Sequence, residues 1–247
     1  MMKRFLMLIM LVPSLALAAG KSAFPLDDPQ NDIRDVESLK RGAQTFVNSC
    51  SSCHSANLIR YSRISQDLSW NEEEMRKALK MGDKKIGDYM GGGMPDMAAK
   101  AAFGTAIPDL TLTSRVRGTD WIYTYMRSFY MGEKGNDNVI FPGVAMPNVL
   151  MGHQGMMKPV YEERNGKQVV VGTQPFPEPQ TEEQKAAAAE KAENFDALVR
   201  DLVNFMEYIG EPVKVEREEL GKKVLFYLFI LFIFAWLLKR EYWKDIK

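Results

Sequence analysis

Two segments of the chain carry apolar residues at helical intervals. In the first, residues 36–47, these positions recur at spacings of three and four, which predicts an amphipathic helix with one buried face. Gly42, four residues before Phe46, lacks a side chain, so we expect a second helix to cross closely there. The apolar stripe consists of Val36, Leu39, Ala43 and Phe46.

The second segment follows a helix start signal. Pro179 precedes Thr181, a suitable N-cap, and acidic residues occupy the next turn. Gly210 and Pro212 mark the end of the predicted helix. We expect this helix to cross the first one. Its apolar face comprises Leu198, Leu202, Phe205, Met206 and Ile209.

Shorter elements are predicted between these two helices. Residues 71–81 and 120–130 favour helices, and Gly91–Gly93 favours a turn or loop. Asn165–Gly166 separates two β-prone arms within residues 161–171, which predicts a hairpin with a tight turn. The expected fold is mainly α, with long loops and one small hairpin.

The N-terminus has the pattern of a secretory signal peptide. Lys3 and Arg4 precede an apolar run that ends in small residues, and we predict cleavage after Ala18. Residues 1–18 are therefore expected to be removed. A short N-terminal anchor is the alternative.

The C-terminal region predicts a membrane anchor. Residues 224–238 contain no charge and would span roughly 22 Å as a helix, so flanking residues are needed to cross a core of about 30 Å. We assign the anchor to residues 220–238, in preference to a buried core helix. Four basic residues flank the anchor on each side, so charge does not orient it. Export by the signal peptide predicts a periplasmic domain, residues 19–219, and a cytoplasmic tail, residues 239–247.

Composition adds two constraints. The chain has 247 residues with 32 basic and 32 acidic side chains, and removing Lys3 and Arg4 leaves a net charge of −2. No basic patch favours nucleic acid. Its two cysteines both lie in one motif, so no structural disulfide is expected.

That motif, Cys50-Ser51-Ser52-Cys53-His54, is typical of covalent haem c attachment. Two thiols form thioethers with the haem vinyl groups, and His54 becomes an axial ligand of the iron. A thioredoxin-like pair normally follows a strand, whereas a predicted helix leads here. A zinc site needs about four ligands, and the other histidine, His153, is far away in sequence. One covalent haem is therefore expected.

The residues alone leave the sixth iron ligand open. A methionine ligand raises the reduction potential relative to a second imidazole. Met94 and Met146 each precede a proline, which favours an extended backbone at the methionine. Met146 is favoured, with Met94, His153 or a vacant position as alternatives.

The order of several motifs resembles the cytochrome c1 family, the haem-bearing subunit of the bacterial cytochrome bc1 complex. The resemblance implies that Met146 is the sixth ligand. It also implies that Arg117, with Arg115, pairs with a haem propionate, and that Trp121 donates to one. The motifs are residues 50–61, Ile107–Leu110 with Arg115–Arg117, Phe141–Pro147, and Phe205–Pro212 before the anchor.

The resemblance further implies one-electron transfer in the bacterial inner membrane. A Rieske iron–sulfur protein would reduce the haem, which would then reduce a soluble or tethered cytochrome c, within a dimeric complex containing cytochrome b. Residues 181–219 carry eleven acids and five bases. We interpret this excess first as an ordinary solvated helix face, with a surface that would attract a basic acceptor as the alternative. The alternatives are a tethered cytochrome of an oxidase or nitric oxide reductase, and an open-site haem enzyme or sensor.

Overall fold

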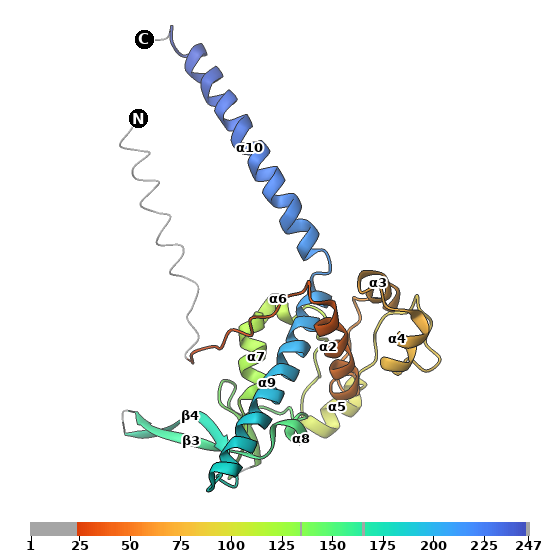
Figure 1. Ribbon diagram of the computed structural model, residues 1–247, viewed down its shortest axis with the longest axis vertical. Coiled ribbons are helices and arrows are strands. Elements are labelled where there is room, and N and C mark those ends of the chain that lie inside the picture. Colours follow the sequence, from red (N-terminus) through yellow and green to blue (C-terminus); the bar gives the residue numbers. More distant parts are fainter. Residues whose placement is uncertain (1–23, 134, 165, 246–247) are drawn as a thin grey trace.

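The computed structural model describes residues 24–133, 135–164 and 166–245. Within these ranges the chain is mostly helical, which confirms the predicted fold class (Figure 1). The predicted signal peptide lies outside the described residues. The helices are α2 (Val36–Ser49), α3 (Tyr61–Asp67), α4 (Glu72–Ala78), α5 (Asp96–Phe103), α6 (Thr113–Arg117), α7 (Thr119–Arg127), α8 (Met151–Gln154), α9 (Glu182–Gly210) and α10 (Lys214–Tyr242).

Helices α2 and α9 cross, as predicted, and lie against each other in Figure 1. They form the centre of the body. Gly42 makes their close approach possible, because a Cβ at this position would lie 2.0 Å from the carbonyl oxygen of Asp201. The rings of Phe46 and Phe205 meet beside it with centroids 5.7 Å apart. Both rings are fully buried, which stabilises the crossing by about 1.5–3 kcal/mol for each side chain.

The start of α9 matches its sequence signal. The Thr181 hydroxyl accepts a hydrogen bond from the backbone N–H of Gln184, and the Gln184 side chain accepts one in return from the backbone N–H of Thr181. This capping box satisfies donors that the first helical turn leaves free. The other end of α9 is Gly210, also as predicted.

Helix α7 packs on the opposite side of α9. Its apolar face buries Ile122, Tyr123 and Met126. At its end, Arg127 forms a bidentate pair with Asp196 of α9, at 2.6 and 2.9 Å. The pair fixes α7 against the central helix, so the three helices α2, α9 and α7 form the framework of the domain.

Among the described residues, two antiparallel hairpins accompany the helices. The predicted one is present and longer than expected, with β3 (Met157–Arg164) paired to β4 (Lys167–Pro175); its turn residue Asn165 lies outside the described residues. The second, β1 (Phe129–Gly132) with β2 (Gly135–Asn138), corrects the prediction of a single hairpin. Strand β2 has the sequence Gly-Asn-Asp-Asn, whose composition disfavours strands, so only its pairing with β1 makes it extended.

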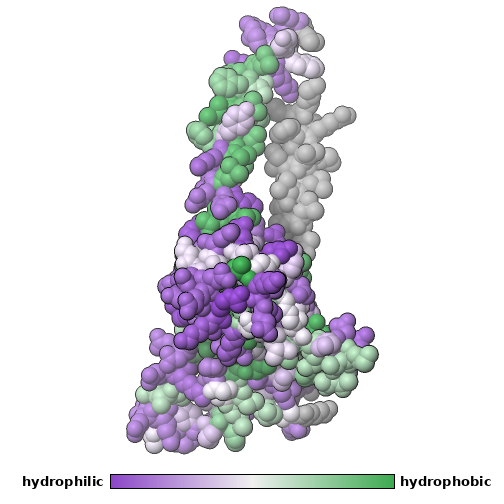
Figure 2. All heavy atoms as spheres, turned by 90° about the vertical axis from the view of Figure 1, so that its right-hand side faces the viewer, coloured by the Kyte–Doolittle hydropathy of each residue, from purple (hydrophilic) through white to green (hydrophobic). Residues whose placement is uncertain are grey.

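Helix α10 projects from the body (Figure 1). Figure 2 shows apolar side chains along it above a largely hydrophilic body. It is 29 residues long and apolar enough to cross a membrane, and none of its apolar stretch is buried against the rest of the described protein. The helix extends beyond the predicted residues 220–238 at both ends, because nothing in the charged segment from Lys214 interrupts helical geometry.

Candidate functional site

The cysteine–histidine motif forms a tight turn at the end of α2. Cys50 ends the helix, and its carbonyl oxygen accepts from the backbone N–H groups of Cys53, at 3.1 Å, and His54, at 2.8 Å. Both thiols are free. Cys50 is buried and Cys53 is half-buried. Burial, with a smaller contribution from the neighbouring Cys53, raises the pKa of Cys50 to about 12, so this thiol is protonated at neutral pH.

The imidazole of His54 has a fixed orientation. Its Nδ1 lies 2.8 Å from the carbonyl oxygen of Pro108. A carbonyl only accepts hydrogen bonds, so Nδ1 carries the hydrogen and Nε2 presents a lone pair. Burial lowers the pKa of His54, although the bond to Pro108 and the charge of Asp109 oppose this effect. A neutral, oriented imidazole is the form that binds a metal.

Asp109 fixes the loop that carries this carbonyl. Its Oδ2 accepts from the hydroxyl of Ser55 and the backbone N–H of Asn57, both at 2.7 Å. Its Oδ1 accepts from the backbone N–H and the hydroxyl of Thr111. Burial alone would raise the pKa of Asp109, but these four bonds outweigh it and lower the pKa. The carboxylate therefore joins the loop after α5 to the residues that follow His54.

His54 and Met146 line the same cleft. The volume of the cleft is about 90 Å³, which is smaller than a porphyrin. Its volume therefore does not identify a haem site, and haem binding is supported instead by the donor atoms that line the cleft. The further lining residues are mostly apolar: Ser49, Cys53, Phe103, Thr105, Ala106, Ile107, Pro108, Ala145, Pro147 and Val149.

These donor atoms suit a covalently attached haem. Two free thiols, separated by two residues, precede an imidazole with an available Nε2, and a thioether lies in the same cleft. The Gly91–Gly93 loop lies against the motif from another direction. A Cβ on Gly93 would come within 3.0–3.1 Å of backbone atoms of Cys53, His54 and Ser55, and the backbone φ of +84° also favours glycine there.

The two competing ligand candidates, Met94 and His153, do not line the His54 cleft. Met94 is next to the motif, but its backbone N–H donates to the carbonyl of Cys53 at 3.0 Å, and the residue does not line the His54 cleft. His153 belongs to the short helix α8 and lines a separate cavity with Lys191 and Phe195 of α9. Of the three predicted candidates, only Met146 shares a cleft with His54.

The predicted propionate partners lie in two different places. The guanidinium of Arg117 is 4.9 Å from the ring centroid of Trp121, which stacks on Tyr125. Arg115 instead pairs with Glu211 at 2.6 Å, where α9 gives way to α10. Arg117 and Trp121 therefore form one cluster with the residues beside Met146, and Arg115 is separate from it. The roles of all three toward a propionate stay predictions.

Two residues beside Met146 were not identified from the sequence. The hydroxyl of Tyr125 donates to the Met146 sulfur at 3.5 Å. The side-chain amide of Asn136 donates to the Met146 carbonyl at 3.0 Å, and its oxygen accepts from the backbone N–H of Asn148 at 3.1 Å. The sequence could have indicated Tyr125, because it lies one helical turn after Trp121, which is a predicted site residue on the same helix. Asn136 lies in the unexpected strand β2, and nothing in the sequence there indicates a site residue.

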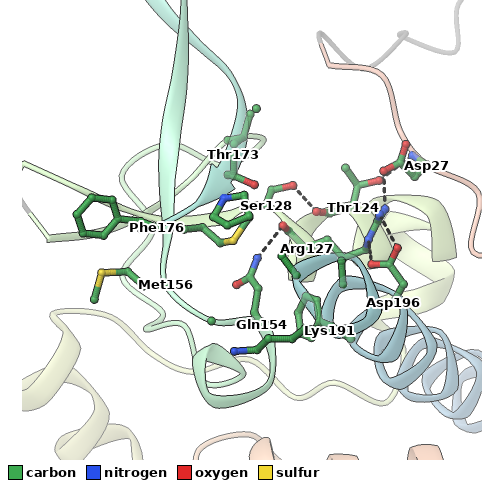
Figure 3. A pocket seen from close by; sticks show the side chains of 18 of the residues that line it. Asp27, Thr124, Arg127, Ser128, Gln154, Met156, Thr173, Phe176, Lys191 and Asp196 are labelled. Atoms are coloured by element: carbon green, nitrogen blue, oxygen red, sulfur yellow. Dashed lines mark hydrogen bonds and ion pairs between the residues drawn. The ribbon is translucent and has the colours of Figure 1, made fainter. Parts of the chain in front are cut away.

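A larger cavity, of about 410 Å³, lies between α7, α9 and the β3–β4 hairpin (Figure 3). Its charged centre is Arg127, which pairs with Asp196 and also with Asp27 at 2.6 Å. None of the predicted site residues lines this cavity. Of these two cavities, the smaller cleft at His54 is the functional candidate, because it joins the cysteine motif to a second potential ligand.

Comparison with known proteins gives a consistent picture. Residues 28–246 match the description "Cytochrome C1 family". Cytochrome c1 of Allochromatium vinosum is 41% identical over 244 residues, covering 96% of each chain, and cytochrome c1 of Rhodospirillum rubrum is 26% identical over 246 residues, covering 86% of this chain and 83% of the relative. A protein of Nitrosomonas europaea named "Ammonia monooxygenase gamma subunit" is 40% identical over 249 residues, covering 100% of this chain and 99% of the relative.

Proposed function

This chain belongs to the cytochrome c1 family, and we propose that it holds one covalent haem c on Cys50 and Cys53, with His54 and Met146 as axial ligands. The family binds haem and provides the electron-transfer subunit of the cytochrome bc1 complex, and that is the function of this chain. One observation carries the ligand assignment: His54, oriented by Pro108, lines the same cleft as Met146.

One-electron uptake and release is the chemistry that a bound haem supplies. The residues of the chain determine where and how this occurs. Cys50 and Cys53 would attach the group, while Pro108 accepts from Nδ1 of His54 and so leaves Nε2 as the basic nitrogen for the iron. The mostly apolar lining would limit the access of water to the ligands of a bound haem, and a methionine ligand favours a high reduction potential. Arg117 and Trp121 are the proposed partners of the propionates.

The ligand assignment is tested by replacing Met146 with Leu in the purified full-length protein. Wild type is expected to give a low-spin oxidised spectrum with a methionine–iron charge-transfer band. The M146L variant should lose this band and have a lower potential. Met94→Leu is the matched control and should keep both properties. A band that survives in M146L and disappears in M94L would show that Met94 is the ligand, and a high-spin wild-type spectrum would favour an open site.

The bc1 complex also contains cytochrome b and the Rieske iron–sulfur protein. We propose that the chain accepts electrons from the Rieske protein and passes them to a cytochrome c, within a dimeric complex. Exposed acidic side chains support a basic acceptor: Glu182, Glu183, Glu190 and Glu193 all lie on the first half of α9. Purification of the tagged chain should recover cytochrome b and an iron–sulfur subunit. Recovery of a monooxygenase or oxidase core instead would refute this assembly.

The proposed topology follows from the two apolar ends. Helix α10 is the candidate anchor of a membrane-anchored family. We propose that residues 1–18 direct export, that residues 19–219 form the periplasmic haem domain, that residues 220–238 cross the inner membrane, and that residues 239–247 are cytoplasmic. Protease added to intact spheroplasts should then degrade the haem domain and leave a C-terminal tag protected.

A further inference from the structure

The hydroxyl group of Tyr125 touches the sulfur of Met146. The Oη–Sδ distance is 3.5 Å, and Met146 is the only hydrogen-bond partner of this hydroxyl among the described residues. Tyr125 is half-buried, and a thioether sulfur is a weak acceptor, so it is unusual that its hydroxyl has no stronger partner among the described residues. Since Tyr125 is no part of the family motifs considered above, the contact needs its own explanation.

The tyrosine ring has little freedom to choose another partner. Trp121 stacks on it with centroids 4.8 Å apart and planes 11° apart. Phe129 and Phe141 approach edge-on, with centroids at 5.0 and 6.5 Å. The backbone of Tyr125 is also held, because its carbonyl oxygen accepts from the side-chain amide of Asn138 at 2.8 Å. Rings on three sides therefore fix the direction of the hydroxyl.

The methionine is fixed from its own side. Asn136 of β2 donates to the Met146 carbonyl and accepts from the backbone N–H of Asn148, so it bridges the two residues that flank Pro147. Strand β2 therefore holds both partners, the donor through Asn138 and the acceptor loop through Asn136. A contact whose donor and acceptor are both held by the surrounding structure is preorganised.

We propose that Tyr125 is a positioning residue that tunes the proposed iron ligand, by donating its hydroxyl hydrogen to the Met146 sulfur. This inference rests on the proposed function, in which Met146 is the axial ligand. A hydrogen bond draws electron density from the sulfur lone pairs and leaves less for oxidised iron. The reduced state is then favoured, and the potential of the site is higher than a methionine alone would give.

The test is Tyr125→Phe in the intact protein, with Tyr123→Phe as the matched control. Both variants remove one hydroxyl from a half-buried or buried tyrosine of α7, and Tyr123 is not a partner of Met146. We expect Y125F to keep the methionine–iron band but to shift its wavelength. Its midpoint potential should fall, changing the ratio of reduced to oxidised protein at a fixed potential by about two- to tenfold, the effect of a single hydrogen bond. Y123F should match wild type.

The outcomes separate this inference from the proposed function. If Y125F has the wild-type band and potential while M146L loses the band, the ligand assignment stands and the role of Tyr125 is refuted. If Y123F and Y125F shift the potential equally, the hydroxyls act through general polarity and the specific contact is refuted. If M146L keeps the band, the ligand assignment itself fails and this inference fails with it.

Discussion

Replacing Gly42 with Ala tests whether the α2–α9 crossing determines the stability of the haem domain. A Cβ at Gly42 would lie 2.0 Å from the Asp201 carbonyl oxygen and 2.8 Å from the Phe205 Cβ, so α9 must move away by about 1 Å or more to restore ordinary contact. Overpacking of this kind costs about 1–3 kcal/mol of unfolding free energy, whereas removing a helical glycine recovers up to about 1 kcal/mol. We expect a net destabilisation of about 1–2 kcal/mol.

Thermal unfolding of the full chain in detergent, followed by far-ultraviolet circular dichroism, measures this change. A domain of this size loses about 2–4 °C of Tm for each kcal/mol, so G42A should melt roughly 2–8 °C lower than wild type. Gly152→Ala is the control, because Gly152 is also helical and a Cβ there has nothing within 4 Å. A Tm for G42A equal to or above that of G152A would refute the reasoning, since the added methyl group would then fit without moving α9.

Two further substitutions test other parts of the framework. Asp109→Asn should destabilise the domain by about 1–3 kcal/mol at neutral pH, because it leaves donors without their carboxylate. Since hydrogen bonds overcome burial and lower the pKa of Asp109, its contribution is complete above an unfolded pKa of about 3.9 and is lost as the pH falls through the folded pKa; a difference in urea unfolding that does not shrink in acid would contradict this. Thr181→Ala should cost about 1 kcal/mol at the start of α9 and speed hydrogen exchange there, while exchange near Gly210 stays unchanged; uniform acceleration would argue against a local cap.

The central helices were predictable because local and tertiary signals agree there. The stripe through Leu39 and Phe46 has helical spacing, and the structure buries both residues. Gly42 even predicted the crossing, because the absence of a side chain on a buried face has few other uses in a helix. Thr181 and Gly210 marked the ends of α9 by cap chemistry. In each case the residue type is suited to one particular backbone geometry, a close helix crossing or a helix end, and therefore indicates it.

The β1–β2 hairpin was not predictable, because its strands depend on contacts made elsewhere. Strand β2 is polar, and its residues serve as hydrogen-bonding groups: the Asn138 oxygen accepts from the backbone N–H groups of Ile140 and Phe141, and Asn136 bonds to the Met146 loop. Short helices such as α3 and α8 were missed for a related reason, since seven or four residues give too few turns to show a period.

The failure to predict the β1–β2 hairpin also explains why the sequence alone left the sixth iron ligand undecided. Met94 and Met146 both precede proline, so local sequence treats them alike. What distinguishes them is where their backbones are tied. The backbone N–H of Met94 donates to the carbonyl of Cys53, so Met94 lies against the attachment turn itself. The Met146 carbonyl instead accepts from the side chain of Asn136, and Met146 lines the same cleft as His54. The proposed ligand thus lies on a loop anchored apart from the attachment turn, and the unpredicted strand β2 supplies an anchor for it.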